Sequence, residues 1–135
     1  MITITGIPSS QKRHRHTRSG IVYDPSSSDK KNFILKLLDH KPDKPINGSI
    51  TILITFVFPY PKKYFRSGRY KDLLKDNAPK HHAVKPDLDN LIKFLLDVLQ
   101  DAKFIDNDSR ICEILAKKCY GKDPRTEFDL CETGE

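Results

Sequence analysis

Apolar and polar residues alternate in two parts of the chain, and this period of two predicts strands. The clearer case is 49–58 (SITILITFVF), where one face consists of isoleucine and phenylalanine alone. Its second face is also partly apolar, so we expect this strand to lie centrally in a sheet. The opening residues alternate in the same way, with Ile2, Ile4 and Ile7 as candidates for one face, and predict a first strand.

An apolar spacing of three to four residues replaces this alternation in two other segments and predicts helices. The first is 29–40, a short helix that we expect to bury Phe33 and Leu37. The second runs from 87 to about 102 and is strongly amphipathic. Its apolar stripe consists of Leu88, Leu91, Ile92, Leu95, Leu99 and Ala102, and its opposite face of Asp89, Lys93, Asp97 and Gln100.

Two further strands are predicted near the C-terminus, over 111–120 and 126–131, and we expect them to pair with each other in antiparallel orientation. A polar excursion rich in Lys, His and Tyr, 59–85, separates the central strand from the long helix. The order of elements predicts the α+β class, with a mixed or largely antiparallel sheet packed with two main helices. At 135 residues the chain has room for one modest core, so we expect a single domain over 1–135.

Charge and cysteine content narrow the range of partners and compartments. The chain has 24 Lys and Arg against 18 Asp and Glu, a net charge of +6, which favours a polyanionic partner. Its three cysteines form no C-x-x-C pair, so neither a disulfide framework nor a zinc site is expected. No stretch approaches the roughly 18 apolar residues of a membrane span, and the N-terminus lacks the pattern of a signal peptide. We therefore expect a soluble protein of the cytoplasm.

The stretch KPDLDNLIK (85–93) places two aspartates, Asp87 and Asp89, where the long helix begins. One interpretation is local: Asp is a favoured helix cap, and Asp89 with Lys93 forms an i,i+4 pair of the kind that stabilises helices by a few tenths of a kcal/mol. The other is a divalent-metal site, because Mg²⁺ takes oxygen ligands and is usually held by one or two carboxylates plus substrate phosphate. Spacing alone leaves both open.

A metal site of this kind calls for a third carboxylate, and the turn FIDNDSRI (104–111) offers Asp106 and Asp108. A helix from 89 to 101 rises about 18 Å, whereas the seven steps from 101 to 108 span at most about 25 Å. Asp108 can therefore return to the two helix-start aspartates only if the chain runs almost straight back. If it does not, Asp108 could serve the site of a second subunit.

Two basic segments point to nucleic acid as the polyanion. QKRHRHTR (11–18) carries four fixed cations, and YPKKYFRSGRYK (60–71) combines five cations with four aromatic residues and no acid. Cations neutralise phosphates, and aromatic rings can stack on unpaired bases. The residues that we expect to contact DNA are Lys12, Arg13, Arg15, Arg18, Lys62, Lys63, Arg66 and Arg69.

With these residues in view, the sequence resembles the RusA family of Holliday-junction resolvases. The resemblance rests on 85–111, where D-x-D-N-L-x-K precedes an apolar helix and an acidic turn. The early basic segment IPSSQKRHRH (7–16), the apolar strand before the motif and the lysine-bearing segment AKK (116–118) agree with it. The similarity spans most of the chain in order, and its central motif is specific.

The resemblance implies roles for particular residues. The family's catalytic, metal-binding aspartates fall on Asp87, Asp89 and Asp108, and its catalytic lysine falls on Lys93. Lys118, in the AKK segment, joins the predicted DNA contacts. The family usually has adjacent acids in the last turn, whereas this sequence has an asparagine between Asp106 and Asp108. That departure leaves Asp108 in register and makes Asp106 a second candidate.

The resemblance also implies a function. It points to a homodimer that uses Mg²⁺, with Mn²⁺ as a substitute, to cut branched DNA. The expected substrates are four-way junctions, resolved by paired nicks in DNA recombination and repair. Two alternatives stay open. One is a less selective Mg²⁺-dependent nuclease acting on flaps or single strands, which the segment 60–71 would suit. The other is a branched-DNA-binding module without catalytic activity.

Overall fold

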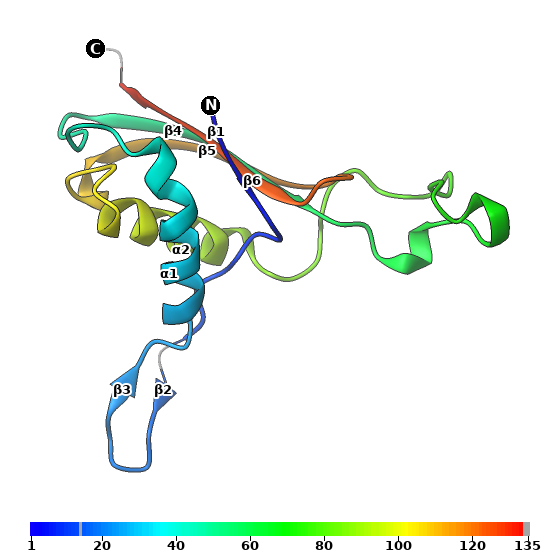
Figure 1. The fold of residues 1–135 in the computed structure, drawn as a ribbon, viewed down its shortest axis with the longest axis horizontal. Helices are drawn as coiled ribbons and strands as arrows, with labels where there is room; N and C mark the ends of the chain where they lie inside the picture. Colours follow the sequence, from blue (N-terminus) through cyan, green and yellow to red (C-terminus); the bar gives the residue numbers. More distant parts are fainter. Residues whose placement is uncertain (14, 134–135) are drawn as a thin grey trace.

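Four strands form the main sheet of the molecule, and two helices pack on one of its faces (Figure 1). The computed structural model describes residues 1–13 and 15–133, with Arg15 described by its backbone alone. The strands of the main sheet are β1 (Ile2–Thr5), β4 (Ile50–Phe58), β5 (Ile111–Tyr120) and β6 (Arg125–Glu132). The helices are α1 (Ser27–Leu37) and α2 (Leu88–Asp101), and a small hairpin consists of β2 (Arg15–His16) and β3 (Val22–Tyr23). Short 3-10 turns are η1 (Leu38–His40), η2 (Lys62–Tyr64), η3 (Gly68–Tyr70) and η4 (Asp108–Arg110).

The sheet has the order β1-β6-β4-β5, so β4 is central as its two-sided apolar pattern predicted. It runs antiparallel to β6 and parallel to β5, which confirms a mixed sheet. The expected pairing of the two C-terminal strands with each other is wrong, because β4 lies between them. Between β5 and β6 the chain passes the end of β4, and Gly121 allows this close approach. The N–H of Gly121 donates to Phe58 O at 2.9 Å, and a Cβ at Gly121 would lie 2.6 Å from the Val57 side chain.

The hydrophobic core lies between the sheet and α2, and the elements confirm the predicted helix stripe. Leu91, Leu95 and Leu99 are buried on α2 against the isoleucine and phenylalanine face of β4. Helix α1 packs beside α2, where the Phe33 and Phe94 rings meet edge to face with their centroids 5.8 Å apart. This packing fixes the direction of α2 and with it the position of the polar residues on its exposed face. Ile7, a candidate for the first strand, instead lies beyond β1 and is 63% exposed.

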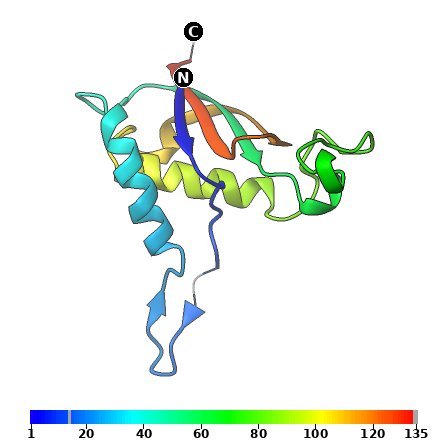
Figure 2. The same ribbon diagram turned by 45° about the vertical axis from the view of Figure 1, so that its right-hand side comes forward.

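Two projections leave this body (Figures 1 and 2). The first is the β2–β3 hairpin, which contains residues 15–18 of the basic segment 11–18 and extends away from the sheet beyond α1. The second, residues 59–82, is an arm that leaves the end of β4 and returns toward the start of α2. None of the described helices combines the length and apolar character needed to cross a membrane.

Candidate active site

Asp87 and Asp89 stand at the start of α2, as the motif predicted, and neither caps that helix through a described side-chain hydrogen bond. Asp87 occupies the N-cap position with extended backbone, yet its side chain makes no capping hydrogen bond. Asp89 lies in the first turn and is exposed. Within the described part of the chain, Lys93 makes no ion pair with Asp89 or Asp97. Capping and local ion pairing therefore do not account for the two carboxylates.

An open cleft joins these carboxylates to the basic segment. Its volume is about 880 Å³, and its lining residues are Gln11, Lys12, Arg13, Asp87, Asp89, Asn90, Lys93 and Asp97. The main chain connects the two sides, because the N–H of Gln11 donates to Asn90 O at 3.0 Å. The cleft thus brings two cations of the N-terminal segment together with three carboxylates and a lysine from α2 and its N-cap. Such a cleft can bring phosphate and a divalent cation together.

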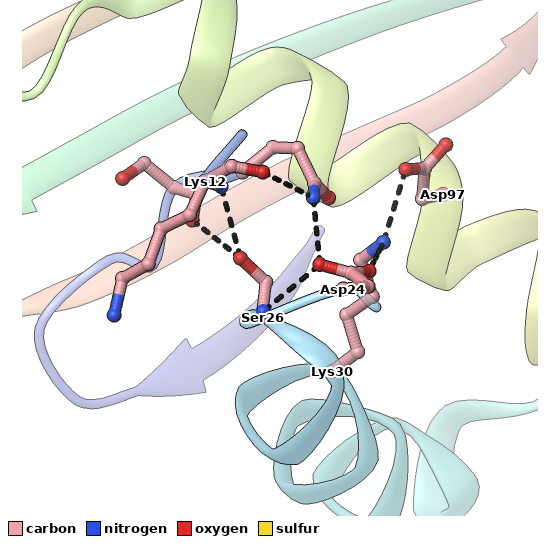
Figure 3. Close-up of polar contacts among 7 residues, drawn as sticks. Lys12, Asp24, Ser26, Lys30 and Asp97 are labelled. Carbon is pink, nitrogen blue, oxygen red and sulfur yellow. Dashed lines mark hydrogen bonds and ion pairs between the residues drawn. The ribbon is translucent and has the colours of Figure 1, made fainter. Parts of the chain in front are cut away.

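A partly buried ion pair network connects the base of the hairpin to α2 (Figure 3). The ammonium of Lys30, on α1, lies 2.8 Å from Asp24 Oδ2 and 3.3 Å from Asp97 Oδ2. Asp24 Oδ1 also accepts from the N–H of Ser26 at 2.9 Å and from Gln11 at 3.0 Å. The network therefore links the residues beside the hairpin to the helix that carries the aspartates. The sequence carries no local sign of this network, because Lys30 and Asp97 are 67 residues apart.

The network sets the ionisation of its members. Burial disfavours the charged form of Asp24, but hydrogen bonds from Lys30, from the Ser26 backbone and from Gln11 outweigh it and lower its pKa to about 2. Burial likewise acts to lower the pKa of Lys30, and its hydrogen bonds to Asp24 and Asp97 reverse the direction, so that the pKa rises. Both groups are charged at neutral pH, and with Asp97 they connect α1 and the residues before it to α2.

Asp108 lies at the opposite end of α2 from the other two candidate ligands. Its N–H donates to the side chain of Gln100 at 2.9 Å. Eleven helical steps, or roughly 16 Å, separate Asp89 from Gln100. Consistent with this separation, the described residues contain no group of three or more His, Cys, Asp or Glu side chains that could hold a metal ion. The second candidate, Asp106, pairs with Arg110 at 3.4 Å.

Most aromatic residues of the arm pack on one another. The ring of Tyr60 stacks on Tyr120 with centroids 4.8 Å apart, and its hydroxyl donates to Pro79 O at 2.8 Å. Tyr64 and Phe65 each meet Tyr60 edge to face. Tyr70 differs, because it is 46% exposed and its ring carries the guanidinium of the neighbouring arginine at 4.9 Å. Of these rings, Tyr70 has the accessibility that stacking on a base requires.

The basic residues of the arm face solvent. Lys62, Lys63, Arg66 and Arg69 are all exposed, as expected for phosphate contacts. In the hairpin region Lys12, Arg13 and Arg18 are exposed, and the side chain of Arg15 lies outside the described part of the chain. Lys118 differs from the rest, because its ammonium donates to two main-chain carbonyls, Val84 O at 2.7 Å and Pro86 O at 2.8 Å.

Comparison with known protein families identifies the family to which the chain belongs. The family model described as Endodeoxyribonuclease RusA matches residues 4–130, nearly the whole chain. The chain belongs to the RusA endodeoxyribonuclease family. It is therefore an enzyme that hydrolyses DNA, from a family that acts on branched DNA junctions and depends on a divalent metal. No curated protein matches the chain.

Proposed function

We propose that this protein is a Mg²⁺-dependent, structure-selective endonuclease that resolves four-way DNA junctions by paired nicks in recombination and repair. The observation that carries the proposal is the cleft at the start of α2. There Asp87 and Asp89, free of capping bonds, lie with Lys12 and Arg13 in a chain of the RusA family. A junction nuclease needs both features, cations to hold the phosphate backbone and carboxylates to hold the metal beside it.

The donor chemistry of the cleft fits a hard divalent cation. Carboxylate oxygens are the ligands that Mg²⁺ prefers, and neither Asp87 nor Asp89 has an ion pair to a described cation that would compete. Asp87 and Asp89 would hold the ion, and the chemistry that it would supply there is activation of water and neutralisation of charge on the scissile phosphate. Lys93 lies one turn beyond Asp89 in the same cleft and would stabilise the negative charge that develops on that phosphate. Mn²⁺ offers the same oxygen-binding chemistry and is the expected substitute.

The proposed role of Asp108 as a metal ligand requires a homodimer. Because about 16 Å of helix separates its surroundings from Asp89, a single chain offers two of the three expected ligands. A two-fold dimer makes every contact twice, so Asp108 of each protomer could complete the site of its partner. The same symmetry presents two cutting sites to a four-way junction, which has a two-fold axis of its own. Paired nicks then follow from geometry.

The basic residues would hold the DNA on either side of the cleft. The proposed phosphate contacts are Lys12, Arg13, Arg15, Arg18, Lys62, Lys63, Arg66 and Arg69. The first two line the cleft, the next two belong to the hairpin and the last four to the arm, so one chain can contact more than one duplex arm (Figure 2). Such a spread favours a branched substrate over a linear duplex. The exposed Tyr70 at the arm supplies a ring for an unpaired base, which keeps flaps as a second candidate substrate.

The proposal is tested by comparing substrates. Wild-type protein is incubated with a labelled four-way junction, a flap and a linear duplex of matched sequence, in Mg²⁺, Mn²⁺ or EDTA. Metal-dependent nicks in two opposite strands of the junction, with the duplex uncut, are expected. Equal cutting of the flap and the junction would support the less selective nuclease. Tight junction binding with no cleavage in any metal would contradict the proposal and support a binding module.

A further inference from the structure

The loop that delivers Asp87 to the cleft is held by a lysine from a distant strand. Lys118, on β5, donates from its ammonium to Val84 O at 2.7 Å and to Pro86 O at 2.8 Å. Pro86 directly precedes Asp87, so one of the two bonds ends on the peptide unit that joins the loop to the aspartate. The side chain of Lys118 is partly buried, whereas its neighbour Lys117 is exposed.

Upstream of this loop, the main chain is already attached to β5. The N–H of Tyr120 donates to Lys80 O at 2.9 Å, and the N–H of His82 donates to Lys118 O at 3.3 Å. The His82 ring is buried and stacks on Phe58 with centroids 4.0 Å apart, which fixes that end of the segment. The chain is thus anchored to the sheet up to residue 82.

Residues 83–86 lack such anchors. In the described part of the chain, no main-chain hydrogen bond to another segment holds them before α2 begins at Leu88. Their described attachment is the ammonium of Lys118. It also draws two carbonyl oxygens toward one point, an arrangement in which their dipoles repel unless a donor lies between them. Without that donor, no described hydrogen bond holds residues 83–86 to the sheet.

We propose that Lys118 is a positioning residue, which fixes the main chain at Asp87 so that its carboxylate stands ready for the metal. The inference rests on the proposed function, in which Asp87 is a metal ligand. It replaces the predicted DNA contact of Lys118, because two of the three ammonium protons are committed to protein carbonyls. Groups that orient a metal ligand characteristically affect metal affinity ten- to a hundredfold, whereas a lost phosphate contact affects DNA affinity and its salt dependence.

The test separates metal binding from DNA binding. Mn²⁺ alone is titrated into the purified full-length protein and its free concentration is followed by electron paramagnetic resonance. In parallel, the Kd for a four-way junction is measured in EDTA at several salt concentrations. Lys118→Met keeps the aliphatic stem, and Lys117→Met removes the same charge from the next position on the same strand. Asp89→Asn serves as the reference for a lost ligand.

Lys118→Met is expected to raise the Kd for Mn²⁺ about tenfold while the junction Kd stays within about twofold and the salt slope is unchanged. Lys117→Met is expected to leave the Kd for Mn²⁺ at its wild-type value. Weaker junction binding with a flatter salt slope and unchanged Mn²⁺ affinity in Lys118→Met would overturn the inference and restore the DNA contact. Unchanged values in all assays would overturn it as well.

Two further measurements keep the outcome clear. If Lys118→Met does not fold, Lys118→Arg replaces it: the planar head keeps the charge but does not reproduce the ammonium position between both carbonyls, so Mn²⁺ affinity should still fall and junction affinity should not. A wild-type protein that binds no Mn²⁺, or an Asp89→Asn variant that binds it normally, would contradict the proposed metal site itself. Loss in Asp89→Asn with full binding in both Lys118 variants would contradict the positioning role alone.

Discussion

Two variants that are each inactive should restore cleavage when mixed, if Asp108 of one protomer completes the site of the other. Asp89→Asn and Asp108→Asn each remove one carboxylate from both sites of a homodimer. In a mixed dimer, the Asp108→Asn protomer keeps Asp87 and Asp89 and receives an intact Asp108 from its partner. One site is then whole, while the second lacks two carboxylates.

The separation along α2 makes a shared site necessary, and random subunit exchange sets the expected amount of cleavage. Asp108 contacts Gln100, roughly 16 Å along the helix from Asp89, so a single-chain site would not hold both carboxylates. Random exchange in an equal mixture gives about half mixed dimers, each with one whole site of two, or about a quarter of the wild-type number of sites. If each site belonged to one chain, every site in the mixture would lack a carboxylate and the yield would be zero.

The assay is cleavage of a labelled four-way junction after subunit exchange between the two variants. Single nicks are expected from the mixture and paired nicks from the wild type, because a mixed dimer has one working site. Asp87→Asn mixed with Asp89→Asn is the matched control: both changes lie on the same side of each site, so no mixed dimer contains a whole one. Protomers of different mass are used to verify that mixed dimers have formed. If the mixed dimers leave the junction uncut while the wild type cuts it, the shared site is refuted.

Three further predictions follow from the cleft and its surroundings. Asp24→Asn should lower the free energy of unfolding by about 2 kcal/mol at pH 7, because the folded pKa of Asp24 is about 2 against an ordinary 3.8. This stabilisation is present above the unfolded pKa and is lost as the pH falls from 3.8 toward 2, so urea unfolding should show the two proteins converging there; a difference independent of pH would contradict it. Arg13→Ala combined with Arg15→Ala should weaken junction binding and reduce its salt slope by about 2, and an unchanged slope would remove these residues from the interface. Tyr70→Ala should weaken binding to a flap or a junction without lowering the melting temperature, whereas Tyr60→Ala should lower the melting temperature, and the reverse result would contradict the assignment of the exposed ring.

The periodicity of apolar residues was sufficient to predict the main helices and strands, but not which strands pair with each other. The two-sided apolar pattern of 50–58 identified the central strand because a strand with neighbours on both sides has little contact with water. The pairing of 111–120 with 126–131 was wrong because alternation records which face is buried and not which strand lies next. Instead, the most apolar strand, β4, pairs with both β5 and β6, and Gly121 allows the chain to pass the end of β4.

The site shows the same division between local and distant information. The motif around Asp87 and Asp89 lies within a few residues, so spacing alone brought both to the start of one helix. Chain length allowed Asp108 either to return or to stay away, and only the fold shows it at the far end of α2. Lys30 and Lys118 look like ordinary surface lysines in the sequence. Their roles depend on partners that are distant in sequence, Asp97 for Lys30 (67 residues away) and Pro86 for Lys118 (32 residues away).

The most direct test of the central claim is junction cleavage by the Asp89→Asn variant beside the wild type. Asp101→Asn is the control, since it removes an exposed carboxylate from the other end of the same helix. We predict that Asp89→Asn binds the four-way junction at least as tightly as the wild type and makes no nicks in Mg²⁺, while Asp101→Asn cuts normally. Full cleavage by Asp89→Asn would contradict a metal site at the start of α2.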